Sequence, residues 1–218
     1  MIDNAFRALL PGFVAPVLAL YARLGVTPNQ VSALGFVIAI CASVAVALDF
    51  WGLAFALWWL SRLADGTDGL WARQSGLESN FGAYLDIVLD MAAYGAMVLG
   101  FAYAAPEFQL RWMAMLFLYV VCITSALALG MQEAKQAMAP RDDRGLRLGA
   151  GLAEGGETGI AYSLFLLLPD YLWLSTGVWV VVLATTVLAR TLLAFRTLGY
   201  VDSTEGGRPA NVTDESRL

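Results

Sequence analysis

The 218-residue sequence contains no histidine and only two cysteines, Cys41 and Cys122. Without histidine, the chain lacks the usual protein ligand of zinc and copper. The cysteines lie in separate apolar stretches, so we expect two buried thiols rather than a disulfide. Lysine and arginine total 13 and form no basic run, which disfavours a nucleic-acid partner.

Charge is scarce throughout the chain. Charged residues make up 14% of the sequence and hydrophobic residues 59%, and the mean hydropathy is +0.67. This balance is typical of a protein that crosses a membrane several times. The N-terminus has an early acid, Asp3, and no signal-peptide charge pattern, so we expect no cleavage there.

Six apolar stretches, each close to the roughly 20 residues that cross a bilayer, predict an all-α integral membrane protein. The first begins at Pro28, after a predicted capping box of Thr27 and Gln30. The others cover residues 52–73, 82–104, 109–132, 156–174 and 175–197. Residues 3–24 contain two prolines and predict an amphipathic helix at the membrane interface.

These elements divide the chain into a juxtamembrane segment, 1–26, a six-helix membrane domain, 27–198, and a polar tail, 199–218. If both termini lie on one side, only Arg111 falls on the opposite side. Positive residues concentrate on the cytoplasmic side of membrane proteins. We therefore expect both termini in the cytoplasm and the protein in a bacterial inner membrane.

Four aspartates interrupt the apolar sequence between residues 65 and 90. Asp65 and Asp68 are three residues apart, and Asp86 and Asp90 are four apart, so each pair shares one helix face. A short polar turn separates the pairs, which predicts two antiparallel helices that bring the carboxylates together.

Ionised carboxylates inside a membrane are costly unless something compensates them. Arg62 and Arg73 are the only cations nearby in the sequence. Divalent metal is the simplest compensation, because carboxylates alone suit Mg²⁺, Mn²⁺ or Ca²⁺. Two metals bridged by carboxylates would also clamp phosphoryl oxygens during an in-line displacement.

Eight residues in this stretch form one spaced pattern. They read Asp65-x-x-Asp68-Gly69-x-x-Ala72-Arg73, eight further residues, and Gly82-x-x-x-Asp86-x-x-x-Asp90. The pattern resembles the motif of the CDP-alcohol phosphotransferase family (class I CDP-alcohol phosphatidyltransferases) at all eight positions. The resemblance implies a homodimer that transfers a phosphatidyl group from a CDP-linked donor, chiefly CDP-diacylglycerol, to a polar alcohol in phospholipid biosynthesis, with release of CMP.

The resemblance also implies roles for the aspartates. Asp65, Asp68 and Asp86 would bind Mg²⁺ or Mn²⁺, as two ions, and Asp65 and Asp68 would also border the donor. Asp90 would belong to the metal cluster and act as the general base that takes the alcohol's proton.

Small residues beside the aspartates predict a nucleotide site. Gly69, Ala72 and Gly82 would let a nucleotide approach the backbone, and tight helix packing is the alternative explanation. Arg73 either pairs with phosphate or anchors the helix at the interface. Thr27 and Asn29 either start a helix only or present its N-terminus to an anion of the donor.

The sequence gives weaker evidence for the residues that bind the acceptor alcohol. Lys135, Arg141 and Arg147, with Arg144 between them, either bind a phosphorylated acceptor or are ordinary positive residues of the cytoplasmic side. Glu157, at the start of the fifth stretch, either recognises hydroxyls or an amine or is stabilised by the helix dipole.

Two other functions fit parts of the pattern. The same motif permits a CDP-linked small alcohol as donor and a lipid alcohol as acceptor. A cation- or proton-coupled transporter also carries acids inside the membrane. The clustering of the acids near one face, rather than along a path, favours the transferase.

Overall fold

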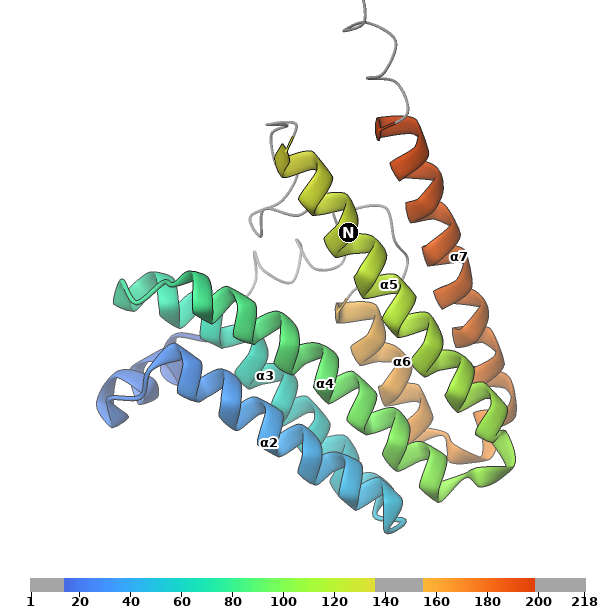
Figure 1. Ribbon diagram of the computed structural model, residues 1–218. Coiled ribbons are helices and arrows are strands. Elements are labelled where there is room, and N and C mark those ends of the chain that lie inside the picture. Colours follow the sequence, from blue (N-terminus) through green and yellow to red (C-terminus); the bar gives the residue numbers. More distant parts are fainter. Residues whose placement is uncertain (1–13, 136–154, 199–218) are drawn as a thin grey trace, which may run out of the picture.

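The computed structural model describes residues 14–135 and 155–198 (Figure 1). Every element in these ranges is helical. A short helix, Val14–Leu24, comes first. The longer helices are α2 (Pro28–Ala47), α3 (Trp51–Ser75), α4 (Asn80–Ala104), α5 (Gln109–Lys135), α6 (Gly155–Leu167) and α7 (Leu172–Leu198). Short 3-10 turns, η1 (Pro106–Phe108) and η2 (Pro169–Tyr171), precede α5 and α7.

Local sequence explains where the helices near the aspartates begin and end. The predicted capping box of α2 is confirmed, because the Thr27 hydroxyl accepts from the Gln30 N–H and the Gln30 side chain accepts from the Thr27 N–H. Gly76, with φ of 67°, ends α3 in the left-handed conformation. The Ser79 side chain then caps α4 by accepting from the Gly82 N–H.

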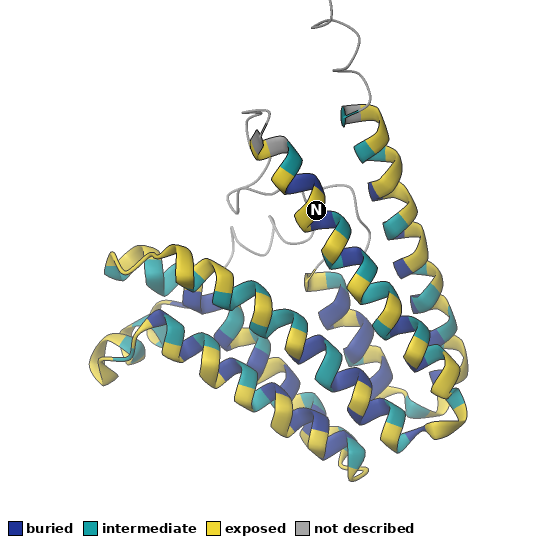
Figure 2. Cartoon of the chain, viewed as in Figure 1, coloured by how far each residue is buried: buried dark blue, intermediate teal, exposed yellow. Residues whose placement is uncertain are grey.

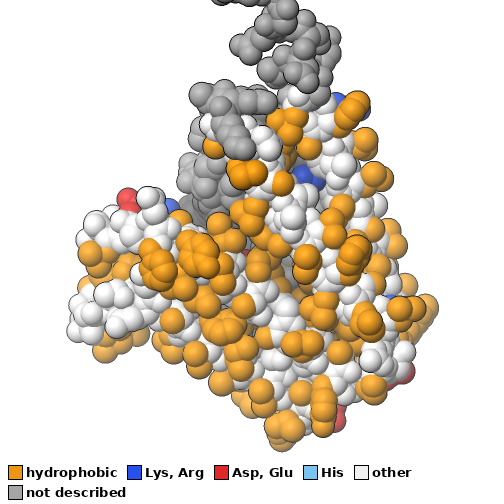
Figure 3. Space-filling view, in the orientation of Figure 1, with side chains coloured by type: hydrophobic (Ala, Val, Ile, Leu, Met, Phe, Trp, Pro, Cys, Tyr) orange, Lys and Arg blue, Asp and Glu red, His pale blue; other side chains and the backbone are white. Residues whose placement is uncertain are grey.

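Four segments are long and apolar enough to cross a membrane. They are Pro28–Ala47, Asn80–Ala104, Pro106–Gln132 and Pro169–Arg196. Helix α3 has the length but carries four charged residues between positions 62 and 73, and α6 has only 13 residues. Hydrophobic side chains dominate the outer surface seen in Figure 3. The structure therefore confirms an all-helical membrane protein.

Two expectations are wrong in detail. The boundary between the last two stretches lies at Pro169, because α6 ends at Leu167 and α7 begins at Leu172 rather than 175. Proline lacks the N–H that would continue the helix. Both cysteines are free, and Cys122 is buried, but Cys41 is exposed. A thiol on the outside of a membrane helix faces lipid, which is also apolar.

The helices form two groups, α2–α4 and α5–α7, which converge at the end containing η1 and η2 and diverge at the other end (Figure 1). Helix α2 packs along both α3 and α4, whereas α3 and α4 have little direct backbone contact. The two aspartate-bearing helices therefore meet mainly through their side chains. Helix α2 joins them.

Glycines permit the close crossings of α2. A Cβ atom at Gly35 would lie 3.1 Å from the Ala64 Cβ of α3. A Cβ atom at Gly100 of α4 would lie 2.5 Å from the Ser43 carbonyl oxygen of α2, which is too close for any other residue without a shift. These two contacts set the distances from α2 to α3 and to α4.

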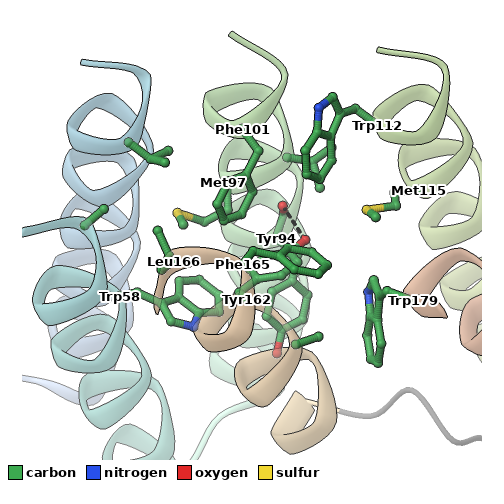
Figure 4. Packing of buried hydrophobic residues seen from close by; sticks show 14 of the residues in the cluster. Trp58, Tyr94, Met97, Phe101, Trp112, Met115, Tyr162, Phe165, Leu166 and Trp179 are labelled. Carbon is green, nitrogen blue, oxygen red and sulfur yellow. Dashed lines mark hydrogen bonds between the residues drawn. The ribbon is translucent and has the colours of Figure 1, made fainter. Parts of the chain in front are cut away.

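Buried residues face the inside of the bundle (Figure 2), where aromatic rings link the two groups of helices (Figure 4). Tyr162 of α6 donates its hydroxyl to the Tyr94 carbonyl oxygen of α4 at 3.1 Å. Trp58 Nε1 of α3 donates to the Gly159 carbonyl oxygen at 3.5 Å. These bonds hold the start of α6 against α3 and α4, beside the aspartates.

Candidate active site

The four aspartates form one cluster between α3 and α4. Asp65 interacts electrostatically with the other three, and Asp68 also interacts with Asp86 and Asp90. Asp68 is buried, with 4% of its surface exposed, and the others are half-buried. We call Asp65 and Asp90, which lie farther from the α3–α4 turn, the deep end, and Asp68 and Asp86 the shallow end. The structure thus brings together the carboxylates that the spacing links.

Arg62 occupies the deep end of the cluster. It forms ion pairs with Asp90 and, at 3.5 Å, with Asp65. Its guanidinium carbon lies 4.6 Å from the centre of the Trp58 ring and 5.1 Å from that of Tyr94. The sequence places Arg62 near the aspartates but does not by itself pair it with an acid. The available signal was its position three residues before Asp65, on the same helix face.

Asp68, at the shallow end, is held by two hydrogen bonds. The Ser32 hydroxyl of α2 donates to Asp68 Oδ2, and the Gly69 N–H donates to Asp68 Oδ1 at 2.6 Å. Ser32 is not among the residues predicted from the sequence, because one serine on an apolar helix gives little signal. Helix α2 thus contributes directly to the carboxylate cluster.

The short helix Val14–Leu24 docks beside the shallow end. The hydroxyls of Tyr21 and Thr67 are hydrogen-bonded at 3.0 Å, and Thr67 is the neighbour of Asp68. Trp71 Nε1 of α3 donates to the Val26 carbonyl oxygen at 2.9 Å. These contacts fix the N-terminal end of α2 against the C-terminal part of α3.

The donor chemistry of the cluster fits a divalent cation. Carboxylate oxygens from both helices are the ligands that Mg²⁺ and Mn²⁺ take, and such an ion relieves the repulsion among four acids. In the ranges that the structure describes, no three acidic or thiol side chains are already oriented to share one ion. Asp90 is turned toward Arg62, and Asp68 toward Ser32. Asp65, Asp68 and Asp86 are residues that could hold the metal, with Asp90 as the fourth acid of the cluster.

The two motif glycines have different surroundings. Among the described residues, a Cβ atom at Gly69 would meet only the Arg73 guanidinium, at 3.9 Å. At Gly82 it would lie 3.0 Å from Asn29 Oδ1 and 3.1 Å from Ser79 Oγ. Close packing therefore explains Gly82 but not Gly69, where space beside the backbone is open.

The other predicted donor residues lie around the same end of the bundle. Ala72 is half-buried and Arg73 is exposed in the last turns of α3. Asn29 lies in the first turn of α2, beside Gly82. Thr27 uses its hydroxyl to cap α2, which already accounts for its presence.

The predicted acceptor residues are only partly described. Arg141, Arg144 and Arg147 lie outside the described residues, and Lys135 is the last residue of α5. Glu157 lies in the first turn of α6, and its Oε2 atom is buried without a hydrogen-bond partner among the described residues. This turn borders the cluster, because a Cβ atom at Gly155 would lie 3.2 Å from the Tyr94 hydroxyl.

A second buried arginine lies in the other group of helices. Arg190 of α7 is 4% exposed and donates to the Cys122 carbonyl oxygen of α5 at 2.8 Å. Its Nε atom is buried without a hydrogen-bond partner, and no carboxylate in the described ranges pairs with it. Arg190 is not among the residues predicted from the sequence, although an arginine inside an apolar stretch is a known signal of function.

The chain is similar in sequence to one family of known membrane proteins. The profile of CDP-alcohol phosphatidyltransferases matches residues 25–189. The chain is 35% identical to an inner membrane protein, YnjF, of Escherichia coli, over 67% of this chain and 72% of that protein. It is 29% identical to the phosphatidylinositol phosphate synthase of Mycobacterium tuberculosis, over 83% of this chain and 84% of the synthase.

Solved structures show the same fold. The M. tuberculosis phosphatidylinositol phosphate synthase with CDP-diacylglycerol bound superposes with a TM-score of 0.64 at 22% identity, covering 86% of this chain and 96% of that one. The same synthase in complex with manganese and citrate superposes with a TM-score of 0.63 at 20% identity, covering 86% and 91%.

Proposed function

The chain belongs to the CDP-alcohol phosphatidyltransferase family, and from this we propose that it transfers a phosphatidyl group from CDP-diacylglycerol to a polar alcohol, with release of CMP, in phospholipid synthesis. The observation that carries the proposal is the single cluster made by the four motif aspartates. The M. tuberculosis structure that contains CDP-diacylglycerol supports this donor. A CDP-linked small alcohol is the alternative donor, and a transporter would place its acids along a path.

In the proposed reaction, the alcohol oxygen forms a bond to the lipid-bearing phosphorus while the bond from that phosphorus to CMP breaks. Asp90 takes the proton of the attacking hydroxyl. Asp65, Asp68 and Asp86 hold the divalent cations, which when bound neutralise charge on the phosphate oxygens. Ser32 and the Gly69 N–H orient the Asp68 carboxylate for this task.

The donor's cytidine end is proposed to lie against the C-terminal part of α3. Open space beside the Gly69 backbone admits a flat group there. Arg73, exposed one turn later, is placed to pair with phosphate. Thr27, Asn29, Ala72 and Gly82 complete the proposed site.

The proposed cofactor is Mg²⁺ or Mn²⁺, with two ions at the cluster. The acids alone supply an oxygen-only ligand set, which suits these ions. The manganese complex of the M. tuberculosis synthase supports divalent metal use in the family.

We infer that the acceptor carries a phosphate as well as its reacting hydroxyl. Arg190 supports this, because a buried guanidinium with no acid partner among residues 14–135 and 155–198 is suited to an anionic group. Several relatives are phosphatidylinositol phosphate synthases. The product in that name carries a phosphate in addition to the one in its phosphatidyl group. Glu157 is proposed to accept hydrogen bonds from the acceptor's hydroxyls, and Lys135, Arg141 and Arg147 to draw the anion toward the site.

The proposed membrane arrangement has six spans, with α3 and α6 added to the four apolar ones. Charges on α3 belong to the proposed site, and one face of α6 packs against the bundle. Residues 1–26 would lie at the interface, 27–198 would form the membrane domain, and both termini and the cluster would face the cytoplasm. We also propose a homodimer, and an inner-membrane location is supported by the E. coli relative.

The test of function is a screen of alcohols and phosphorylated alcohols with purified protein, CDP-diacylglycerol and Mg²⁺, with lipid products identified by mass. We expect a new phospholipid and equimolar CMP. If no acceptor yields CMP, phosphatidyl transfer is refuted. Reporter fusions at each terminus test the topology, and a periplasmic C-terminus would contradict six spans.

A further inference from the structure

Arg111 lies in the first turn of α5, at the end of the bundle that contains η1 and η2 and is opposite the carboxylate cluster (Figure 1). Among residues 14–135 and 155–198, no other lysine or arginine lies at this end. No carboxylate in the same ranges forms an ion pair with it. The proposed reaction gives this cation no role.

The Arg111 guanidinium is fixed against α7 through one of its nitrogen atoms. Nη1 donates to the Trp173 carbonyl oxygen and, at 3.0 Å, to the hydroxyl of the buried Thr176. A Cβ atom at Gly177 would lie 3.6 Å from Nη1, so the guanidinium rests against the helix backbone. Nε and Nη2 have no hydrogen-bond partner in the described part of the chain and are not enclosed there. This free edge is the one that binds a phosphate through two hydrogen bonds.

An apolar groove along α7 begins at this guanidinium. Its volume is about 420 Å³, and its lining extends from Arg111 and Trp173 to Val181 and Val182. Helix α7 rises roughly 13 Å between Trp173 and Val182, and half of the hydrocarbon core of a bilayer is about 15 Å thick. Trp173 is more than half exposed, as tryptophans at the headgroup level of a membrane are. The groove therefore extends from the headgroups to about the middle of the bilayer.

A second apolar groove lies beside the first, between α6 and α7. Its volume is about 340 Å³, and its lining includes Phe165, Leu168 and Trp179. Leu174 and Val178 line both grooves and therefore form a ridge between them. A phospholipid has two acyl chains that are joined near its phosphate. The paired grooves offer a place for each chain.

The acids at this end indicate the kind of headgroup. Glu107 lies in η1, just before α5, and Asp170 lies in η2, just before α7. Both are exposed, and neither forms an ion pair within the described ranges. A headgroup with a net negative charge would be repelled by these acids. A headgroup that combines a phosphate with an amine matches both signs of charge.

We propose that Arg111 and the two grooves bind a phospholipid whose headgroup carries an amine, in the leaflet opposite the carboxylate cluster. Nε and Nη2 of Arg111 hold the phosphate, and the amine lies near Glu107 and Asp170. The acyl chains occupy the grooves on either side of Leu174 and Val178. The bound lipid supports the packing of α5 and α6 against α7 and takes no part in the proposed transfer reaction.

The test measures lipid binding to the purified full chain by native mass spectrometry, after delipidation in detergent. Phosphatidylethanolamine should occupy one tight site per chain. Diacylglycerol with the same acyl chains lacks the phosphate and should bind at least about tenfold more weakly. Phosphatidylglycerol lacks the amine and should bind about three- to tenfold more weakly. Glycerophosphoethanolamine lacks the chains and should not displace the lipid at equal concentration.

Variants separate the phosphate contact from the grooves. Arg111→Gln should weaken phosphatidylethanolamine binding by about 10- to 100-fold, the loss expected for a charged hydrogen bond. Val181→Trp fills the first groove without changing Arg111 and should weaken binding at least about tenfold. Val120→Trp is the matched control, because Val120 of α5 is as exposed as Val181, at 62% against 61%, and lines neither groove. Its affinity should stay within about twofold of the wild type.

Several outcomes would overturn the proposal. Equal binding of diacylglycerol and phosphatidylethanolamine would make the grooves ordinary lipid-facing surface, and tighter binding of phosphatidylglycerol would contradict the amine. Conversion of a dimer to a monomer by Val181→Trp would make the first groove an interface between two copies of the chain. If Arg111→Gln does not fold, Val181→Trp and the comparison with diacylglycerol still decide, because both leave Arg111 intact.

Discussion

The two groups of helices bury charge in opposite ways. Helices α2–α4 hold four interacting carboxylates around one arginine, Arg62. Helices α5–α7 hold Arg190, which has no acid partner in the described part of the chain. A cluster of carboxylates is stabilised by a bound cation, and a buried guanidinium without an acid beside it is stabilised by a bound anion. This difference is the basis of the proposal that one group binds metal and the donor's phosphates, while the other receives an anionic part of the acceptor.

Removing metal should have the largest effect, because it leaves the α2–α4 group with uncompensated acids. Excess EDTA should abolish CMP release, and added Mg²⁺ or Mn²⁺ should restore it. The measurement is CMP formation in detergent micelles at increasing chelator. Full activity in EDTA would refute metal binding by helices α2–α4.

The next largest effects distinguish the two ends of the carboxylate cluster. Asp90→Asn should lower transfer by about 10²–10⁴-fold, the range for loss of a general base, while keeping metal-dependent donor binding. Asp68→Asn should weaken metal and donor binding together. Calorimetric titration of CDP-diacylglycerol with Mg²⁺ into each variant, paired with a transfer assay, tests this. Equal loss of binding in both variants would make Asp90 a ligand rather than the base.

Arg190→Gln addresses the other group of helices. It removes a charged donor but keeps a polar side chain, so the acceptor KM should rise by about 10- to 100-fold, the loss expected for a charged hydrogen bond. The donor KM should stay constant, as it should in the exposed control Arg196→Gln. An unchanged acceptor KM in a folded Arg190→Gln protein would remove the reason for assigning anion binding to α5–α7.

The smallest effects come from glycines, measured as thermal unfolding in micelles. Gly100→Ala should destabilise by about 1–3 kcal/mol, because its Cβ atom would meet the Ser43 carbonyl oxygen at 2.5 Å. Gly69→Ala should leave stability unchanged within about 1 kcal/mol, since among the described residues its Cβ atom would meet only the Arg73 guanidinium, at 3.9 Å, and should raise only the donor KM. A destabilised Gly69→Ala variant would show that packing, not nucleotide access, requires this glycine.

Local spacing predicted the site better than it predicted the packing around it. Helix geometry alone places Asp65 with Asp68, and Asp86 with Asp90, on shared faces. The start of α2 followed from Thr27, because a capping box is complete within four residues. Such patterns are readable because every residue involved is near in the chain.

The contacts that orient the acids join distant residues, and no spacing rule finds them. Arg62 reaches Asp90 across 28 positions, and Ser32 reaches Asp68 across 36. Which cation meets which acid depends on how the helices pack. That packing depends on close approaches such as the one at Gly100, whose glycine is indistinguishable in sequence from any other in an apolar helix.

We expect the glycine crossings of α2 to influence which divalent ion the carboxylate cluster prefers. Gly35 and Gly100 set how far α3 and α4 stand from α2, and therefore the gap between the two carboxylate pairs. Mg²⁺ requires ligand distances of about 2.0–2.1 Å, whereas Ca²⁺ accepts about 2.3–2.6 Å. A wedge at Gly35→Ala, which would widen the gap by a few tenths of an ångström, should shift the preference from Mg²⁺ toward Ca²⁺. The measurement compares the concentrations of Mg²⁺ and Ca²⁺ that displace bound Mn²⁺ from the wild type and from the variant. A shift would occur without any change in the carboxylates themselves.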